Sequence, residues 1–107
     1  MSTPRPGKRV RGSQTGRPIM AAFDLLGRRW ALRVLWELGE APSTFRELRG
    51  RCDDVSPTVL NTRLRELREA RLIEKTDQGY ALTEPGRSLG RALRPLTRWA
   101  EDWGGAN

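Results

Sequence analysis

Residues 55–69 read VSPTVLNTRLRELRE, a pattern that predicts one amphipathic helix. Ser56 is a good N-cap, and Pro57 at the first helical position loses nothing, because its missing N–H would have no partner there. At about 100° per residue, three leucines fall on one narrow stripe that suits a hydrophobic core. We therefore expect Leu60, Leu64 and Leu67 to face inward.

The opposite face of this helix is polar and carries Thr58, Asn61, Thr62, Arg65 and Glu69. Hydroxyl, amide and guanidinium groups near a helix N-terminus are the side chains that contact base edges in a DNA major groove. A polar face also belongs to any solvated surface helix, on which Arg and Glu pair at i,i+4 spacing. The helix by itself leaves both interpretations open.

The composition favours a polyanionic partner. The 107 residues carry a formal net charge of +7, and they suffice for one small domain. No apolar run approaches the ~18 residues that a membrane span needs, and the N-terminus lacks the apolar stretch of a secretory signal. A single cysteine excludes an internal disulfide, so we expect a protein of the reducing cytoplasm.

The positive charge is concentrated at the N-terminus. Residues 1–17 carry five basic side chains and no acidic one, together with several Pro and Gly residues and almost nothing to bury. This composition predicts a disordered basic arm. Such an arm either serves only solubility or adds contacts to phosphates and the minor groove. Its candidate DNA contacts are Arg5, Lys8, Arg9 and Arg11.

Two helices are expected between this arm and residue 40. Residues 19–26 predict a helix that ends at Gly27, with Phe23 and Leu26 on its inner side. Residues 30–39 predict a second helix that is apolar on most sides and therefore central.

A helix-turn-helix follows. Thr44 is expected to cap a third helix, because Glu47 three residues later completes a capping box, and Phe45 and Leu48 supply its core contacts. A short polar link then leads to the helix at 57–69. Two helices joined in this way, the second with an exposed polar face, are typical of a helix-turn-helix.

A short hairpin is expected next. Residues 72–76 and 80–82 have the composition of strands, and they flank a three-residue turn at 77–79 that contains Gly79. A hairpin directly after a helix-turn-helix predicts a winged helix, a mainly α fold with a small β-hairpin. Lys75 and Gln78 are the candidate wing contacts to DNA.

Thr83 is expected to cap a last helix over about residues 84–103. Its apolar arc comprises Leu89, Ala92, Leu93, Leu96, Trp99, Ala100 and Trp103, and a ridge of Arg87, Arg91, Arg94 and Arg98 lies opposite. The tryptophan end extends beyond the hairpin, which favours a homodimer over the alternative that both rings fold back on the first helix. The expected interface residues are Phe23, Leu93, Leu96, Trp99 and Trp103. Pro95 should bend this helix or shift its register. The folded domain is thus expected over residues 18–103, with a disordered tail at 104–107.

In this order, the segments resemble the HxlR-type winged-helix transcriptional regulators of bacteria. The marks are Asp24-Leu25-Leu26-Gly27-Arg28-Arg29-Trp30, Leu35-Trp36-Glu37-Leu38, Phe45-Arg46-Glu47-Leu48, Leu60-Asn61-Thr62-Arg63-Leu64-Arg65-Glu66-Leu67, Leu72-Ile73-Glu74-Lys75 and Leu82-Thr83-Glu84-Pro85-Gly86-Arg87. The resemblance covers about residues 17–103. It implies a dimer on short, roughly two-fold symmetric operators, with dimer contacts from the first and last helices.

The chain departs from that family in three places. Members that sense oxidants carry a cysteine just before the proline that opens the first helix, but Arg17 precedes Pro18 here. The hairpin turn is short for a family wing. Pro57 and Thr58 stand where the recognition helix often has Gln and Lys. The resemblance therefore implies neither the cysteine-based sensing nor the operator preference of other members.

Cys52 leaves two interpretations open. The nearby cations Arg46, Arg49 and Arg51 would lower the pKa of its thiol, whereas Asp53 and Asp54 would raise that pKa. A lone cysteine is more often a small buried hydrophobe without a redox task.

We expect no enzyme, metal or cofactor, because the chain has no histidine for acid–base chemistry or metal ligation and no Gly-rich phosphate loop. The prediction is a sequence-specific transcriptional regulator, a repressor that binds double-stranded DNA as a homodimer. A small-molecule effector is left open. The alternative is a winged-helix protein-interaction module. The base-reading candidates are Ser56, Thr58, Asn61, Thr62 and Arg65.

Overall fold

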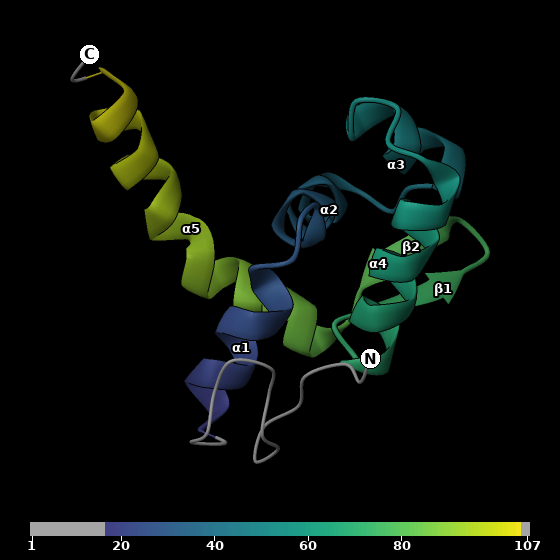
Figure 1. Cartoon of the computed structure of the whole chain (residues 1–107), viewed down its shortest axis with the longest axis horizontal. Coiled ribbons are helices and arrows are strands. Elements are labelled where there is room, and N and C mark those ends of the chain that lie inside the picture. Colours follow the sequence, from purple (N-terminus) through teal and green to yellow (C-terminus); the bar gives the residue numbers. More distant parts are fainter. Residues whose placement is uncertain (1–16, 106–107) are drawn as a thin grey trace.

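The computed structural model describes residues 17–105, which form five helices and one hairpin (Figure 1). The elements in chain order are α1 (Pro18–Leu26), α2 (Ala31–Glu40), α3 (Phe45–Arg51), α4 (Pro57–Glu69), β1 (Ile73–Thr76), β2 (Gly79–Leu82) and α5 (Glu84–Gly105). The predicted order of helices and strands is confirmed, and the fold is a winged helix-turn-helix. α5 continues through Pro95 and ends two residues beyond the expected boundary at 103.

Hydroxyl caps start α3 and α4 as the sequence indicates. The Thr44 hydroxyl accepts from the Glu47 N–H at 3.1 Å, and the Glu47 carboxylate accepts from the Thr44 N–H at 2.8 Å. Ser56 accepts from the Val59 N–H at 3.1 Å at the start of α4. Each bond satisfies a backbone donor that the first turn of a helix otherwise leaves unpaired.

The core lies among α2, α3, α4 and the hairpin. The leucine stripe of α4 is buried as predicted, with Leu60, Leu64 and Leu67 all at 2% exposure or less. Val34 of α2 and Leu48 of α3 are also fully buried against it. Because these contacts come from one chain, the helix-turn-helix is held in place without a partner.

The predicted inner faces of the first two helices are partly wrong. Phe23 points outward, and α1 instead buries Ala21 and Leu25. α2 is less enclosed than expected, because Leu32 and Trp36 are exposed. In a nine-residue helix with apolar residues on most sides, the sequence pattern does not distinguish the face that packs.

The hairpin turn is one residue shorter than predicted. Thr76 pairs with Gly79, so only residues 77 and 78 form the turn. Gly79 has φ +110, and a side chain there would collide with the Ser43 carbonyl. This close approach lets Ser43 and Tyr80 exchange two backbone hydrogen bonds, at 2.8 and 2.9 Å, which join the segment before α3 to the hairpin.

A buried ion cluster ties α4 to the connection between α1 and α2. Glu66 is 5% exposed, and its carboxylate accepts from both Arg28 and Arg63 at 2.5 Å. Arg28 also pairs with Asp24 of α1 at 3.1 Å. Arg63 donates to the Arg29 carbonyl at 2.9 Å. The Arg–Glu alternation of α4 is thus not only a solvated face, since one of its carboxylates is a structural link.

α5 leaves the body of the molecule along its second half (Figure 1). Its start is fixed by Thr83, whose hydroxyl accepts from the Gly86 N–H at 3.2 Å and donates to the Arg71 carbonyl at 2.6 Å. No helix between residues 17 and 105 combines the length and apolar composition that a membrane crossing requires.

Candidate nucleic-acid interface

The polar face of α4 is presented to solvent. Thr58, Asn61 and Arg65 are exposed and Thr62 is half-buried. They border a hollow of about 460 Å³ whose other lining residues are Leu64, Arg68 and Tyr80. The structure therefore brings together four of the five base-reading candidates from α4, and Ser56 stands at the same end of the helix as its cap.

These groups differ in how far they are already engaged. The Thr62 hydroxyl donates to the Thr58 carbonyl at 3.0 Å, which leaves its oxygen able to accept. Arg65 meets Glu69 at 3.4 Å in a largely exposed pair that costs little to break. The Asn61 amide makes no hydrogen bond to any residue between 17 and 105. An unpaired amide on this face can donate and accept together, as recognition of an adenine edge requires.

Arg68 and Tyr80 complete the hollow and were missed by the sequence analysis. Arg68 lies seven residues after Asn61, and this spacing alone would have placed it on the same face of the helix. Tyr80 belongs to β2, and its contribution depends on how the hairpin packs against α4. No local sequence pattern predicts that packing.

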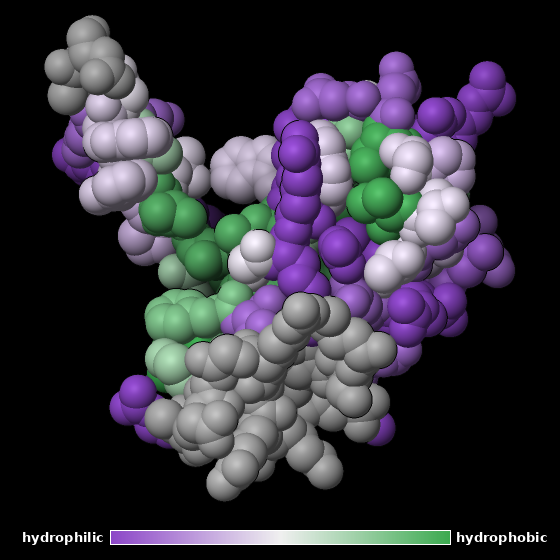
Figure 2. All heavy atoms as spheres, viewed as in Figure 1, coloured by the Kyte–Doolittle hydropathy of each residue, from purple (hydrophilic) through white to green (hydrophobic). Residues whose placement is uncertain are grey.

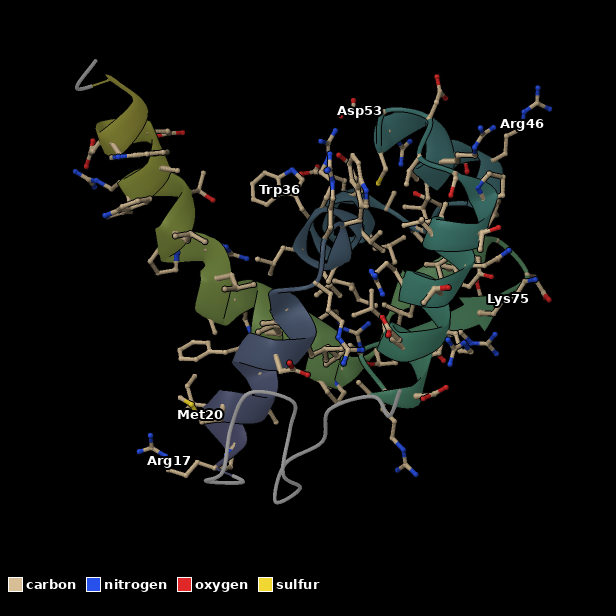
Figure 3. The ribbon with its side chains drawn as sticks, in the orientation of Figure 1. Arg17, Met20, Trp36, Arg46, Asp53 and Lys75 are labelled. Carbon is tan, nitrogen blue, oxygen red and sulfur yellow. The ribbon has the colours of Figure 1, made fainter. Side chains whose placement is uncertain are left out.

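The hairpin candidates are divided between the hollow and the turn. The Lys75 ammonium lies 5.6 Å from the centre of the Tyr80 ring, so this cation sits beside the hollow (Figure 3). Gln78 is exposed in the turn, where its N–H donates to the Thr76 hydroxyl at 3.1 Å. A turn of two residues gives the wing little reach beyond Lys75.

The basic residues around α3 have separate tasks. Arg49 donates to the Val55 carbonyl at 2.8 Å and braces the turn between α3 and α4, whereas Arg51 donates to the Ser43 hydroxyl at 2.7 Å and ties the end of α3 to the segment before it. Arg46 instead points into solvent at the start of α3 (Figure 3). It was not among the predicted DNA contacts. The predicted contacts Arg5, Lys8, Arg9 and Arg11 lie outside the described residues.

Cys52 is fully buried at the end of α3. Burial raises the pKa of its thiol, and the Arg33 guanidinium opposes this shift in part. The cation that acts on the thiol is thus Arg33 of α2, and not the cluster of Arg46, Arg49 and Arg51 considered from the sequence. An enclosed thiol with a raised pKa is a poor nucleophile.

The residues predicted for a dimer interface form an exposed apolar surface. Leu93 is half-buried, but Phe23, Leu96, Trp99 and Trp103 are 48–65% exposed. The two indole rings stack on each other at 5.4 Å and do not fold back on α1. Hydrophobic residues run from the middle of α5 to α1 on the face in view (Figure 2). Two further exposed side chains, Ile19 and Trp36, were not predicted as part of this surface.

Known proteins place this chain in context. A family model described as HxlR-like helix-turn-helix matches residues 25–107. The Bacillus subtilis protein named uncharacterized HTH-type transcriptional regulator YvaP is 30% identical over 90 residues, which cover 77% of this chain and 82% of YvaP. The HTH-type transcriptional regulator YodB of the same organism is 29% identical over 90 residues, covering 78% of this chain and 80% of YodB.

Solved structures agree with this likeness. The quinone-bound YodB of B. subtilis superimposes with a TM-score of 0.71 at 30% identity, covering 78% of this chain and 94% of that one. A possible HxlR family transcriptional factor from Thermoplasma volcanium has a TM-score of 0.71 at 23% identity, covering 91% of this chain and 94% of that one. The second similarity bears on the fold alone.

Proposed function

We propose that this chain acts as a homodimer on a two-half-site operator. The premise is that the chain belongs to the HxlR-like helix-turn-helix family and is a DNA-binding regulator of transcription. In this proposal α4 enters the major groove and a second copy of the chain covers the apolar surface of α1 and α5. The bound dimer acts in the cytoplasm and represses by excluding polymerase from the promoter.

The polar face of α4 carries the proposal. Its leucine stripe is fully used by the core, while Asn61, Arg65 and Arg68 border an open hollow at the solvent face. Amide and guanidinium groups in this position match base edges, whereas Lys75 and Arg46 at its margins suit phosphates. Two copies of α4 about 34–36 Å apart would enter successive major grooves, with half-site centres about 10 base pairs apart.

Replacing the proposed base contacts tests this assignment. Asn61→Ala and Arg65→Ala should each reduce the difference in binding free energy between operator and scrambled DNA by the ~1–3 kcal/mol typical of one base contact. Arg46→Ala is the matched control, because loss of a phosphate contact weakens both DNAs alike. The measurement is fluorescence anisotropy on both duplexes at one salt concentration. Unchanged discrimination in both α4 variants would show that another element reads the bases.

The basic arm is proposed to add phosphate contacts. Each neutralised phosphate contributes about −0.9 to the slope of log K against log salt, and we expect about two to four contacts per chain. Deletion of residues 2–16 keeps Arg17 and should remove about one to three of these contacts per chain. The slope should therefore flatten by roughly 2 to 5 per dimer, and operator and scrambled DNA should be weakened alike. An unchanged slope would leave the arm as a solubilising tail, and a loss confined to the operator would make it a minor-groove reader.

A further inference from the structure

A second concavity, the α1 pocket, lies on a different part of the molecule from the hollow beside α4. Its volume is about 560 Å³, and it is lined by Pro18, Ala21, Ala22, Leu25, Leu26, Glu69, Ala70, Arg71, Leu72, Pro85 and Leu89. These residues come from α1, from the end of α4 with the turn that follows it, and from the first part of α5. Figure 1 shows α1 beside the start of α5, next to the end of α4. The volume is within the range of pockets that hold small molecules.

The lining is apolar apart from two charged residues. Glu69 is already engaged by Arg65 at 3.4 Å. The Arg71 side chain makes no hydrogen bond or ion pair with any residue between 17 and 105, and it is the only cation among the described lining residues. Arg17, just before α1, and Met20 of α1 point away from α4 (Figure 3). An apolar pocket with one available guanidinium favours a ligand that has an apolar body and an anionic group.

The two sides of the pocket are held differently. The wall formed by Arg71, Leu72 and the start of α5 is fixed by Thr83, which bonds the Arg71 carbonyl at 2.6 Å and the Leu72 carbonyl at 3.0 Å. The α1 wall is formed by the small side chains of Ala21 and Ala22 together with two leucines that pack in or against the core, Leu25 and Leu26. A ligand bound between the two walls would therefore contact α1 and the end of α4 together, and it would add to the link that Asp24, Arg28 and Glu66 already make between these helices.

Two other occupants fit the lining less well. The N-terminal arm leads directly to Pro18, but it has almost no apolar side chains to bury between these walls, and its five cations would be repelled by Arg71 as well as attracted by Glu69. A second copy is expected on the exposed face of α1 that carries Ile19 and Phe23, and neither of these residues lines the pocket.

We propose that the α1 pocket binds a small organic anion with an apolar body of one or two rings, and that this binding changes the affinity of α4 for DNA. The second part rests on the function proposed above, but the first does not. Binding can therefore be tested on the full chain without DNA.

The test uses 2-naphthoate as the probe, with 2-acetylnaphthalene as its neutral match and 2-naphthylmethylamine as its cationic match. Alanine methyl groups labelled with ¹³C report the site directly, because Ala21, Ala22 and Ala70 line the pocket whereas Ala41 and Ala81 do not. We expect 2-naphthoate to shift the three lining methyls and to leave the other two in place. The neutral probe should bind more weakly and the cationic probe weakest.

Variants then separate the charge from the apolar walls. Arg71→Asn removes the guanidinium while suiting the left-handed backbone at this position, where φ is +63. It should weaken 2-naphthoate about tenfold or more and leave 2-acetylnaphthalene unchanged. Arg94→Gln, the same loss of charge on α5 away from the pocket, should alter neither. Ala22→Phe should fill the pocket and weaken both probes.

Several results would overturn the proposal. Shifts spread over all alanine methyls, or equal binding to wild type and Arg71→Asn, would show nonspecific association. Binding that appears only after deletion of residues 2–16 would make the arm the occupant. Contacts from the lining methyls to an unlabelled second copy, in a mixed-label sample, would assign the pocket to the dimer. An operator affinity that changes less than about fivefold at saturating probe would remove the regulatory part and leave the DNA-binding function untouched.

Discussion

α4 and α5 are built alike and end up in opposite situations. Each begins at a capping hydroxyl and carries a stripe of large apolar residues along one face. On α4 the stripe is completely buried by this chain, whereas on α5 the exposure reaches 48% at Leu96 and 65% at Trp103. Both patterns are amphipathic, α5 more strongly than α4, so the burial of one stripe and the exposure of the other depend on what surrounds each helix.

This difference separates two kinds of surface. The body of the domain covers the apolar face of α4 and leaves its polar face in solvent, where a polyanion can approach. The second half of α5 extends past the body, and its apolar face is left in solvent instead. Exposed apolar surfaces of this kind mark interaction sites, and two stacked tryptophans are favourable anchors for a second chain.

The largest effect is expected for Trp103→Ala, which tests whether the exposed apolar face of α5 holds a dimer together. In a two-fold dimer both copies lose a buried aromatic anchor, at about 2 kcal/mol or more for each, so the dimer dissociation constant should rise about a thousandfold. Sedimentation velocity at micromolar concentration measures the shift toward monomer. Arg98→Ala, on the opposite ridge of α5, is the control and should sediment like wild type. A Trp103→Ala variant that stays dimeric would place the interface elsewhere.

Matched leucine truncations in the two helices should behave differently. Leu64→Ala creates a cavity in the core and should lower the free energy of unfolding by about 2–5 kcal/mol. Leu96→Ala should change it by no more than about 0.5 kcal/mol, because that side chain is half-exposed within one chain. Both are compared by urea unfolding in the Trp103→Ala background, which removes the contribution of dimerisation. Equal losses would mean that α5 packs on its own body as tightly as α4.

The two acidic residues that bind a pair of arginines offer a smaller contrast. Glu66→Gln removes the shared counter-charge of Arg28 and Arg63 in a buried site and should cost about 1–3 kcal/mol. Glu84 pairs with Arg87 and Arg91 at the surface, where side-chain exposures are 54–67%, so Glu84→Gln should have no measurable effect. Thermal unfolding of both variants decides the matter. A neutral result for Glu66→Gln would remove the cluster as a structural link.

The smallest expected effect is a pH dependence from the cap of α3. Hydrogen bonds from the Thr44 N–H and hydroxyl group lower the pKa of Glu47. Its contribution to stability is therefore complete above the ordinary glutamate pKa of about 4.3 and is lost as the pH falls through the lowered value. Wild type should lose thermal stability between about pH 5 and 3 more steeply than Glu47→Gln. Glu40→Gln, which alters an exposed glutamate that caps no helix, should show the same dependence of thermal stability on pH as wild type.

Local chemistry made much of the fold predictable from the sequence. A hydroxyl at a cap position indicates the start of three helices, at Thr44, Ser56 and Thr83. The spacing of Leu60, Leu64 and Leu67 indicates the inner face of α4. These signals lie within one turn or one helix. The polar face of α4 followed from the same periodicity, and for this reason the candidate site could be placed on α4 from the sequence.

The features that could not be predicted depend on contacts between distant segments. Gly79 belongs to β2, and not to the turn, because the Ser43 backbone approaches it. In the sequence Glu66 resembles any other surface charge, and only the fold brings it into contact with Arg28 from the connection between α1 and α2. Tyr80 lines the hollow beside α4 because of the same kind of long-range packing. Phe23 was misplaced because α1 is too short for periodicity to settle its orientation.

The ion cluster at Glu66 also bears on how the proposed dimer measures DNA. It clamps the reading helix to the segment that leads out of α1, one of the two helices proposed to join the copies. α4 and α1 then move as one rigid unit, so the distance and angle between the two copies of α4 in the proposed dimer are fixed. Inserting one base pair between half-sites turns one of them by about 34° on the duplex, which a rigid dimer cannot follow. We expect such operators to lose affinity sharply in wild type and to be better tolerated by Glu66→Gln, as titration of a spacer series would show.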